Sequence, residues 1–455
     1  MRVTFFIALG PVLAALTFAM IAAAGLSTDI CWTAAITILC ATWWITEPIP
    51  IPATSLIPLA AFPVLGILTP NEVGSAYGSP LVLLLMGGFI LSTAMAASGA
   101  HRRVALTMVN LFGGNSSRRL VFGFMAASAV LSMWISNTAT TLMLLPVALA
   151  VLEKAEDRLL ATPLLLGIAY AASVGGIGTP IGTPPNLVFR EVYMENTGEE
   201  IGFLTWMTWG VPVVLLMIPA MGFWLTRRLT HRGNVEMPEV GGWDSYEKRV
   251  FIVFSITALA WVTRSQPFGG WSSLFGVPGA NDASVALFAV VAMFLIPNGK
   301  GGRLLDWETA GNIPWGMLIL FGGGITIAKA FVSTGLSGAL GEILSGIATW
   351  PIILMILAIC LTITFMTEMT SNTATTTLMM PILAAAALAA DIPPEVLMVP
   401  AAMSASCAFM LPVATAPNVI MFGTGRFTTR TMAQEGFALN LIGAAIITLI
   451  CVTLL

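Results

Sequence analysis

The sequence predicts an all-α polytopic membrane protein with about 11 transmembrane helices plus two re-entrant hairpins, built from inverted repeats. Hydrophobic residues make up 57% of the 455 residues and charged residues only 9%, whereas a soluble domain carries roughly a quarter charged residues. Long apolar stretches recur along the whole chain, which is typical of a protein that crosses the lipid bilayer many times. The net charge of −3 is too small to indicate a nucleic-acid partner.

The apolar stretches give the predicted crossings, because a helix needs roughly 20 apolar residues to span the hydrocarbon core. The first stretch resembles a signal peptide, but the many later spans favour an uncleaved helix. Two further apolar blocks, 118–153 and 350–387, fit hairpins that enter and leave on one side. The predicted crossings are residues 4–25, 29–46, 50–68, 80–100, 158–193 (broken), 202–226, 250–264, 283–298, 314–333, 395–425 (broken) and 433–455.

A polar pentapeptide, SNTAT, occurs twice in these apolar surroundings. It occupies residues 136–140 in the first block and residues 371–375 in the second, an offset of 235 residues (371 minus 136). A proline follows each copy at the same distance, Pro146 and Pro381. Desolvated hydroxyl and amide groups cost free energy unless a partner satisfies them, so the duplicated box indicates a binding site.

The basic residues give the orientation. If both blocks are re-entrant hairpins and the N-terminus is cytoplasmic, sixteen of the nineteen basic residues fall on the cytoplasmic side, and only Arg190, Arg264 and Lys329 fall elsewhere. This bias obeys the positive-inside rule, and it would be lost if the first block were one ordinary span. We therefore expect a multi-pass protein of the cytoplasmic membrane with its C-terminus outside. The cytoplasmic set is Arg2, Arg102, Arg103, Arg118, Arg119, Lys154, Arg158, Arg227, Arg228, Arg232, Lys248, Arg249, Lys300, Arg303, Arg426 and Arg430.

Other duplicated features share nearly the same offset, such as LMGG at 85–88 with LFGG at 320–323, and TPPN at 183–186 with TAPN at 415–418. Five crossings in each repeat is an odd number, so the two repeats must be inverted relative to each other. Inverted repeats with broken segments near the midplane are typical of secondary transporters. The predicted parts are first-repeat scaffold helices (1–117), a first transport part (118–201), a connecting helix and cytoplasmic linker (202–249), second-repeat scaffold helices (250–349), and a second transport part with the final helix (350–455).

The hairpin tips can bind ions of both signs. The helix that enters a tip ends in free carbonyl groups, which attract cations, and the helix that leaves it begins with free N–H groups, which attract anions. Ser132 and Thr367 each stand four residues before a box, one helical turn back on the same face. Oxygen ligands without fixed charge favour sodium over a divalent ion. The alternative is that these side chains only cap a buried turn.

The broken crossings face the tips. Residues 175–186 contain four glycines and three prolines, and residues 411–418 interrupt the second copy, so neither can form an unbroken helix. We expect exposed carbonyl groups and threonine hydroxyls there, although a simple proline kink is the alternative. Glu368 lies inside the second hairpin, where Met133 is its counterpart. It can add negative potential, carry a proton, or serve as a structural acid.

The paired Ser-Asn-Thr boxes together with TPPN and TAPN resemble the divalent anion/sodium symporters, the INDY-type transporters of di- and tricarboxylates. The resemblance covers essentially the whole chain and implies a homodimer in which a transport domain moves as an elevator against a scaffold domain. The co-transported ion would be Na+. One departure is Ala416, where Pro184 stands in the first repeat, and this puts the exact substrate in question.

The resemblance also implies the site residues. The first sodium site would use Ser132, Ser136, Asn137 and Gly182, and the second would use Thr367, Thr370, Asn372 and Ala414, some of them through backbone carbonyl groups. The substrate carboxylates would meet Ser136, Asn137, Thr138, Thr183, Ser371, Asn372, Thr373 and Thr415.

The expected function is sodium-coupled symport of dicarboxylates such as succinate, malate or fumarate. Three alternatives stay open: a sodium-independent carboxylate exchanger of the same fold, a transporter of citrate or an inorganic dianion such as sulfate, and a membrane-embedded enzyme. The enzyme is disfavoured because all six aspartates lie at loops or span ends, both histidines lie in cytoplasmic loops, and no HExxH motif occurs.

Overall fold

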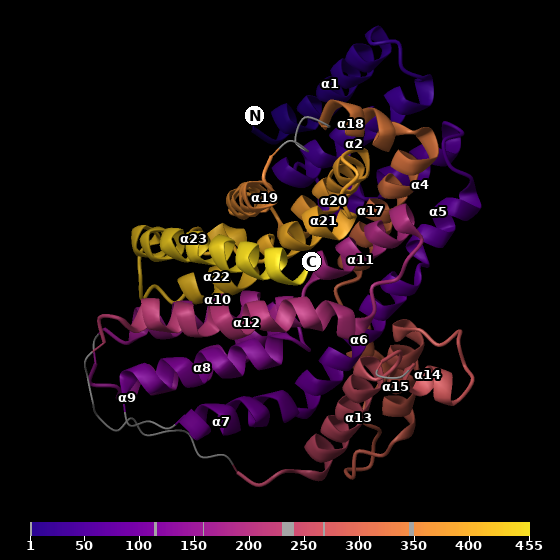
Figure 1. Cartoon of the computed structure of the whole chain (residues 1–455). Coiled ribbons are helices and arrows are strands. Elements are labelled where there is room, and N and C mark those ends of the chain that lie inside the picture. Colours follow the sequence, from indigo (N-terminus) through magenta and orange to yellow (C-terminus); the bar gives the residue numbers. More distant parts are fainter. Residues whose placement is uncertain (1, 113–115, 158, 230–240, 267–268, 345–349) are drawn as a thin grey trace.

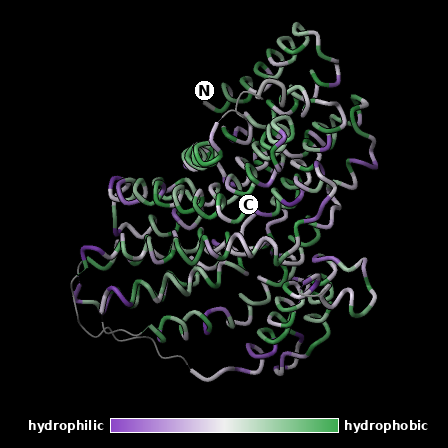
Figure 2. Tube along the Cα trace, in the orientation of Figure 1, coloured by the Kyte–Doolittle hydropathy of each residue, from purple (hydrophilic) through white to green (hydrophobic). Residues whose placement is uncertain are grey.

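A computed structural model describes residues 2–112, 116–157, 159–229, 241–266, 269–344 and 350–455. In these ranges the regular structure is helical (Figure 1). Figure 2 shows apolar residues along most helices, while hydrophilic residues gather near helix ends and in the connections. The all-α polytopic prediction is therefore confirmed. The predicted cytoplasmic linker lies partly outside the described residues, at 230–240.

The first repeat and the helices before it contain these elements: α1 (Arg2–Ala23), α2 (Thr28–Thr46), α3 (Ile51–Thr54), α4 (Leu56–Val64), α5 (Pro70–Tyr77), α6 (Pro80–Ser98), α7 (Ala100–Phe112), α8 (Ser117–Ser132), α9 (Asn137–Lys154), α10 (Ala161–Gly175), the 3₁₀ turn η1 (Gly176–Gly178), α11 (Pro184–Thr197) and α12 (Phe203–Thr226). The second half contains α13 (Ser245–Val262), α14 (Gly270–Leu274), α15 (Asp282–Leu295), α16 (Trp307–Gly311), α17 (Trp315–Thr334), α18 (Leu336–Leu344), α19 (Ile352–Thr367), α20 (Asn372–Ala389), α21 (Pro394–Ser404), the 3₁₀ turn η3 (Pro412–Ala414), α22 (Ala416–Phe422) and α23 (Thr429–Leu454).

Every predicted crossing is largely helical in the described ranges. Eight helical stretches there are long and apolar enough to cross a membrane, by length and composition. Seven of them overlap predicted crossings, although Pro70–Ser98 begins before the predicted span 80–100. The eighth, α20, is the second arm of the second predicted hairpin. The four remaining predicted crossings contain α3 with α4, α13, α15, and the second broken helix, α21 with α22.

The first apolar block is a hairpin, as predicted. Helix α8 ends at Ser132, the chain turns through 133–136, and α9 starts at Asn137. The two open ends meet, because the Ser117 hydroxyl at the start of α8 donates a hydrogen bond of 2.7 Å to the carboxylate of Asp157, just beyond α9. The second block repeats the pattern with α19, a turn at 368–371, and α20.

The two repeats match element by element, from α6–α12 in the first to α17–α23 in the second. Glycine turns mark the match. Gly99 (φ 79°) joins α6 to α7, and Gly335 (φ 81°) joins α17 to α18. Both glycines donate a backbone hydrogen bond of 3.2 Å that caps the preceding helix. A side chain rarely adopts this left-handed conformation, which explains a glycine at both places.

Five short or amphipathic helices were not predicted: α5, α7, α14, α16 and α18. The prediction treated 101–117 as a loop, whereas α7 occupies most of it. A search for apolar stretches misses such helices, because α7 carries His101, Arg102 and Arg103 among its apolar residues. Arg103 binds Glu247 at the start of α13 through two hydrogen bonds, of 2.6 and 2.9 Å, so α7 is fixed to the second half of the chain.

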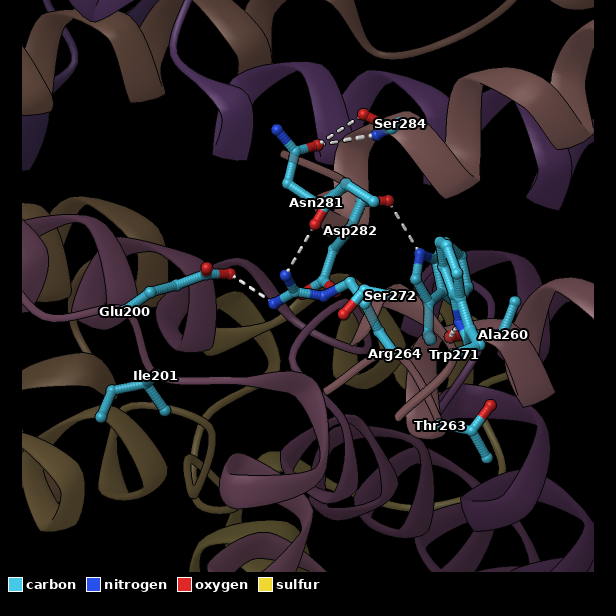
Figure 3. A network of polar contacts seen from close by, with 12 residues as sticks. Glu200, Ile201, Ala260, Thr263, Arg264, Trp271, Ser272, Asn281, Asp282 and Ser284 are labelled. Carbon is cyan, nitrogen blue, oxygen red and sulfur yellow. Dashed lines mark hydrogen bonds and ion pairs between the residues drawn. The ribbon is translucent and has the colours of Figure 1, made fainter. Parts of the chain in front are cut away.

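The three basic residues outside the cytoplasmic set are all paired with acids. Arg190 in α11 lies 2.8 Å from the Asp282 carboxylate. Arg264 lies 2.7 Å from the same carboxylate and 2.8 Å from that of Glu200, and Figure 3 labels these three residues. Lys329 lies 3.3 Å from Glu195. We refer to Arg190, Glu200, Arg264 and Asp282 as the four-charge cluster. Pairing with acids lowers the cost of burying these charges in an apolar protein.

Candidate functional site

A cavity of about 810 Å³ lies between the two hairpin tips and the two broken helices. All eight residues predicted to bind substrate line it: Ser136, Asn137, Thr138, Thr183, Ser371, Asn372, Thr373 and Thr415. The first three come from the tip between α8 and α9, and the matching three come from the tip between α19 and α20. Residues 235 positions apart in the sequence therefore line the same cavity.

Four helices begin at this cavity. Ser136 and Ser371 are the N-cap residues of α9 and α20, and Thr183 and Thr415 are the N-cap residues of α11 and α22. Free N–H groups at helix N-termini attract anions. Ser136 uses its hydroxyl oxygen to accept from Ala139 N at 3.2 Å, whereas Ser371 and Thr183 make no such cap. The Ser371 hydroxyl can therefore face a ligand, whereas the Thr183 hydroxyl oxygen is buried and has no hydrogen-bond partner among the described residues.

The structure brings the first predicted sodium set together. The Ser132 hydroxyl donates to Asn137 Oδ1 at 2.6 Å. A Cβ atom placed on Gly176 would lie 3.0 Å from Asn137 Oδ1 and 3.1 Å from the Gly182 carbonyl oxygen, so this glycine contacts both residues. Ser136 is adjacent at the N-cap, and the four predicted residues converge where α8 ends and the unwound segment passes.

The second predicted set is arranged like the first, with three residues at the cavity and one buried hydroxyl behind it. Thr370, Asn372 and Ala414 line the cavity. Thr367 is fully buried, and its hydroxyl donates to the Ala405 carbonyl oxygen at 3.1 Å. Thr370 lies 2.5 Å from the Thr375 hydroxyl. The structure therefore brings three of the four residues to the cavity and buries the Thr367 hydroxyl behind it, as it buries the Ser132 hydroxyl in the first set.

Glu368 adopts the structural arrangement among the three that the sequence left open. Its carboxylate accepts hydrogen bonds from the backbone N–H groups of Phe409, Met410 and Leu411 at 2.7, 2.8 and 2.9 Å. Asn440 on α23 donates a fourth at 2.8 Å. All four partners are donors, and together they satisfy both oxygens of this buried carboxylate. Glu368 thus ties the second tip to the unwound segment of the second broken helix.

The cavity has no cationic side chain among the described residues that line it, and Glu47 is its one ionisable residue there. Glu47 ends α2 in the left-handed conformation (φ 45°), and its N–H caps the helix at the Trp43 carbonyl. The sequence suggested only a structural role, because Glu47 stands at the end of a predicted crossing. Its place on the cavity wall depends on tertiary contacts that no local pattern records.

Sequence reasoning also missed Asn186 and Asn418, which it used only as part of the TPPN and TAPN motifs. Both are buried, and each donates two hydrogen bonds to backbone carbonyl groups of its own unwound segment. A sequence pattern could have identified them, because in both repeats an asparagine follows the cavity-lining threonine by three residues.

Comparison with known proteins agrees with this architecture. The family described as "Citrate transporter" matches residues 41–399. The chain is 40% identical to the sodium-dependent dicarboxylate transporter SdcS of Staphylococcus saprophyticus, over 97% of this chain and 89% of that protein. It has the same identity and coverage with SdcS of Staphylococcus aureus.

One solved structure, the Alcanivorax borkumensis YdaH transporter, has a similar fold. The TM-score is 0.60 at 16% identity, and the match covers 86% of this chain and 89% of that one. At this identity the likeness concerns the fold alone. The matched family and the listed relatives are all described as transporters, which agrees with the prediction that the protein is not an enzyme. The chain therefore belongs to the citrate transporter family and, as the doubled Ser-Asn-Thr box predicted, to its divalent anion/sodium symporters.

Proposed function

We propose that the protein carries out sodium-coupled symport of dicarboxylates, such as succinate, malate or fumarate, across the cytoplasmic membrane. The observation that carries the proposal is the cavity: four helix N-termini and eight hydroxyl or amide residues, with no lysine, arginine or histidine among the described lining residues. Moving a dianion into such a site is costly without compensating positive charge. Sodium ions bound at the tips supply that charge.

The residues divide into two roles. Ser132, Ser136, Asn137 and Gly182 hold one sodium ion, and Thr367, Thr370, Asn372 and Ala414 hold the other. The substrate carboxylates bind to the hydroxyl and amide groups of the eight residues that line the cavity. Two sodium ions neutralise a dianion, so net current requires one further cation. The SdcS relatives, named as sodium-dependent dicarboxylate transporters, support both ion and substrate.

We further propose an elevator mechanism in a homodimer. The transport domain combines 118–201 with 350–455, the scaffold combines 1–117 with 250–349, and 202–249 connects the repeats. With a cytoplasmic N-terminus and an outer C-terminus, Glu47, Pro314 and Met317 lie at the inner ends of α2 and α17. These three residues line the cavity, which supports an inward-facing state.

Succinate uptake into proteoliposomes tests the function. We expect uptake to require an inward sodium gradient and to fall to background when choline replaces sodium. Uptake that is unchanged in choline would refute sodium coupling, and an obligate need for internal dicarboxylate would identify an exchanger. Competition by malate, fumarate, citrate and sulfate ranks the substrates, and citrate is the second candidate because of the family description.

The site assignment has its own test. We expect Asn137→Ala and Asn372→Ala each to abolish sodium-driven uptake, because each removes an amide from a tip, while both variants still fold and dimerise. Size-exclusion chromatography with light scattering checks folding and assembly. Wild-type uptake in either variant would contradict the assignment.

A further inference from the structure

One buried asparagine donates hydrogen bonds to the backbone of each unwound segment, 176–183 and 408–415, and neither asparagine lines the cavity. Asn186 has no exposed surface, and its Nδ2 group donates to the carbonyl oxygens of Gly176 at 2.9 Å and Thr179 at 2.7 Å. Asn418 is 1% exposed and donates from Nδ2 to Ala408 at 3.0 Å and Leu411 at 3.1 Å. The same contact therefore occurs once in each inverted repeat.

Each asparagine bridges two carbonyl groups that lie three residues apart. In the first repeat, the bridged turn leads directly to Gly182 and Thr183, and in the second it leads to Ala414 and Thr415. These are the residues through which the unwound segments reach the cavity. The position of the carbonyl groups next to the ion sites thus depends on a hydrogen-bonded bridge that lies behind them.

The bridge also connects to the hairpin tip. The Thr179 hydroxyl donates to the carbonyl oxygen of Met133 in the turn of the first tip, so Asn186, Thr179 and Met133 form a chain of contacts from α11 to the tip. In the second repeat, Glu368 makes the link, since it accepts from the N–H groups of 409–411. Loop and tip are therefore held as one unit in both repeats.

A primary amide suits this place, because its nitrogen carries two hydrogens and can bridge two carbonyl groups at once. The oxygen atoms of both amides have no hydrogen-bond partner among the described residues. A buried amide oxygen without a hydrogen-bond partner lowers the stability of the fold. Stability alone therefore does not explain why asparagine stands at these two positions. Glycine-rich segments such as 175–182 would otherwise be flexible, and ordering them on ion binding would weaken affinity.

We propose that Asn186 and Asn418 are positioning residues for sodium binding. Asn186 holds the segment that supplies Gly182 to the first sodium set, and Asn418 holds the segment that supplies Ala414 to the second. Neither touches the ion or the substrate. The inference rests on the proposed function, and it predicts that each asparagine controls sodium affinity more than the maximal transport rate.

The experiment compares Asn186→Ala and Asn418→Ala with wild type and with Asn196→Ala. Asn196 is a matched control, because it lies on α11 as well but donates only to the Val192 carbonyl of its own helix, at 2.7 Å. Succinate uptake is measured against sodium concentration, and the melting temperature of purified protein is measured against sodium without substrate. The second readout needs no transport.

We expect the half-saturating sodium concentration to rise on the order of tenfold in each test variant, with uptake largely restored at high sodium, and no change in the control. Unchanged sodium dependence in both readouts, in folded Asn186→Ala and Asn418→Ala, would overturn the inference. A wild-type protein without a sodium response in either readout would instead overturn the proposed function.

If an alanine variant does not fold, Asn186→Leu and Asn418→Leu replace it. Leucine branches at the same carbon as asparagine but is uncharged and has no N–H donors, so much of the packing is kept while the bridge is lost. Wild-type sodium dependence in the leucine variants would overturn the inference in the same way.

Discussion

At the scale of single residues, one acidic side chain on the cavity wall has no role in the proposed ion or substrate sites. Glu47 is the one ionisable side chain among the described residues that line it. It belongs to α2, in the proposed scaffold, whereas the boxes belong to the proposed transport domain. In the proposed inward-facing state, a carboxylate at this wall would repel a dianionic substrate and so favour its release to the cytoplasm.

We expect Glu47→Gln to tighten succinate binding to the inward-open protein by about fourfold. At a separation on the order of 10 Å in a water-filled cavity, a dianion and one carboxylate repel each other by about 0.8 kcal/mol. Titration calorimetry at fixed sodium and low ionic strength measures the change, and added choline chloride should shrink it by screening. Glu47→Asp keeps the charge and serves as the control. Equal affinity of the Gln variant and wild type would contradict this role.

At the scale of elements, the broken helices are supported from behind by two long helices. Gly210 on α12 packs against the carbonyl oxygen of Ile177, and Gly436 on α23 packs against that of Phe409. Trp206 on α12 also donates to the Ile177 carbonyl at 2.8 Å, and Tyr170 donates to the Phe409 carbonyl at 2.6 Å. In each repeat, the carbonyl at the break therefore meets a glycine and an aromatic donor.

We expect Gly436→Ala to lower stability by about 1–3 kcal/mol, because the added Cβ atom would overlap the Phe409 backbone. The melting temperature in detergent, with and without sodium, measures the loss. Gly74→Ala is the control, since Gly74 lies in α5 with open space around it, and helix propensity there favours alanine. A melting temperature of Gly436→Ala equal to that of wild type would contradict the close packing.

At the scale of the whole molecule, the four-charge cluster joins parts that are distant in the sequence. Arg190 and Asp282 are almost fully buried, at 1% and 2% side-chain exposure, whereas Glu200 is 42% exposed. Arg190 and Glu200 lie in the proposed transport part, and Arg264 and Asp282 lie in the proposed scaffold. Under an elevator mechanism these pairs must separate in each cycle, on the side opposite to the open cavity.

We expect Asp282→Asn to destabilise the protein by about 3–5 kcal/mol, because it leaves two buried guanidinium groups with only Glu200 to compensate them. Thermal unfolding in detergent measures the effect. Glu199→Gln, at an exposed acid next to Glu200, should change stability by less than about 0.5 kcal/mol. A stable Asp282→Asn variant would show that the cluster contributes little to holding the two parts together.

Much of the architecture could be predicted from the sequence. Apolar runs located the crossings because spanning a bilayer imposes a minimum length, and the placement of Arg118, Arg119 and Lys154 indicated that the first block is a hairpin. The matched SNTAT boxes predicted that two distant segments share one site, and the cavity contains both. The short helices α7 and α18 escaped prediction because amphipathic segments carry no apolar run.

By itself, the sequence determined the class of protein, the doubled polar box and the family, since these depend on composition, spacing and local chemistry. Only the tertiary structure decided which buried groups meet. It placed Glu368 beneath the N–H groups of 409–411, Glu47 on the cavity wall, and Arg190 beside Asp282. The Glu368 and Arg190 contacts join residues 41 (409 minus 368) and 92 (282 minus 190) positions apart. Partners at such separations are selected by packing in three dimensions, which no periodicity along the chain encodes.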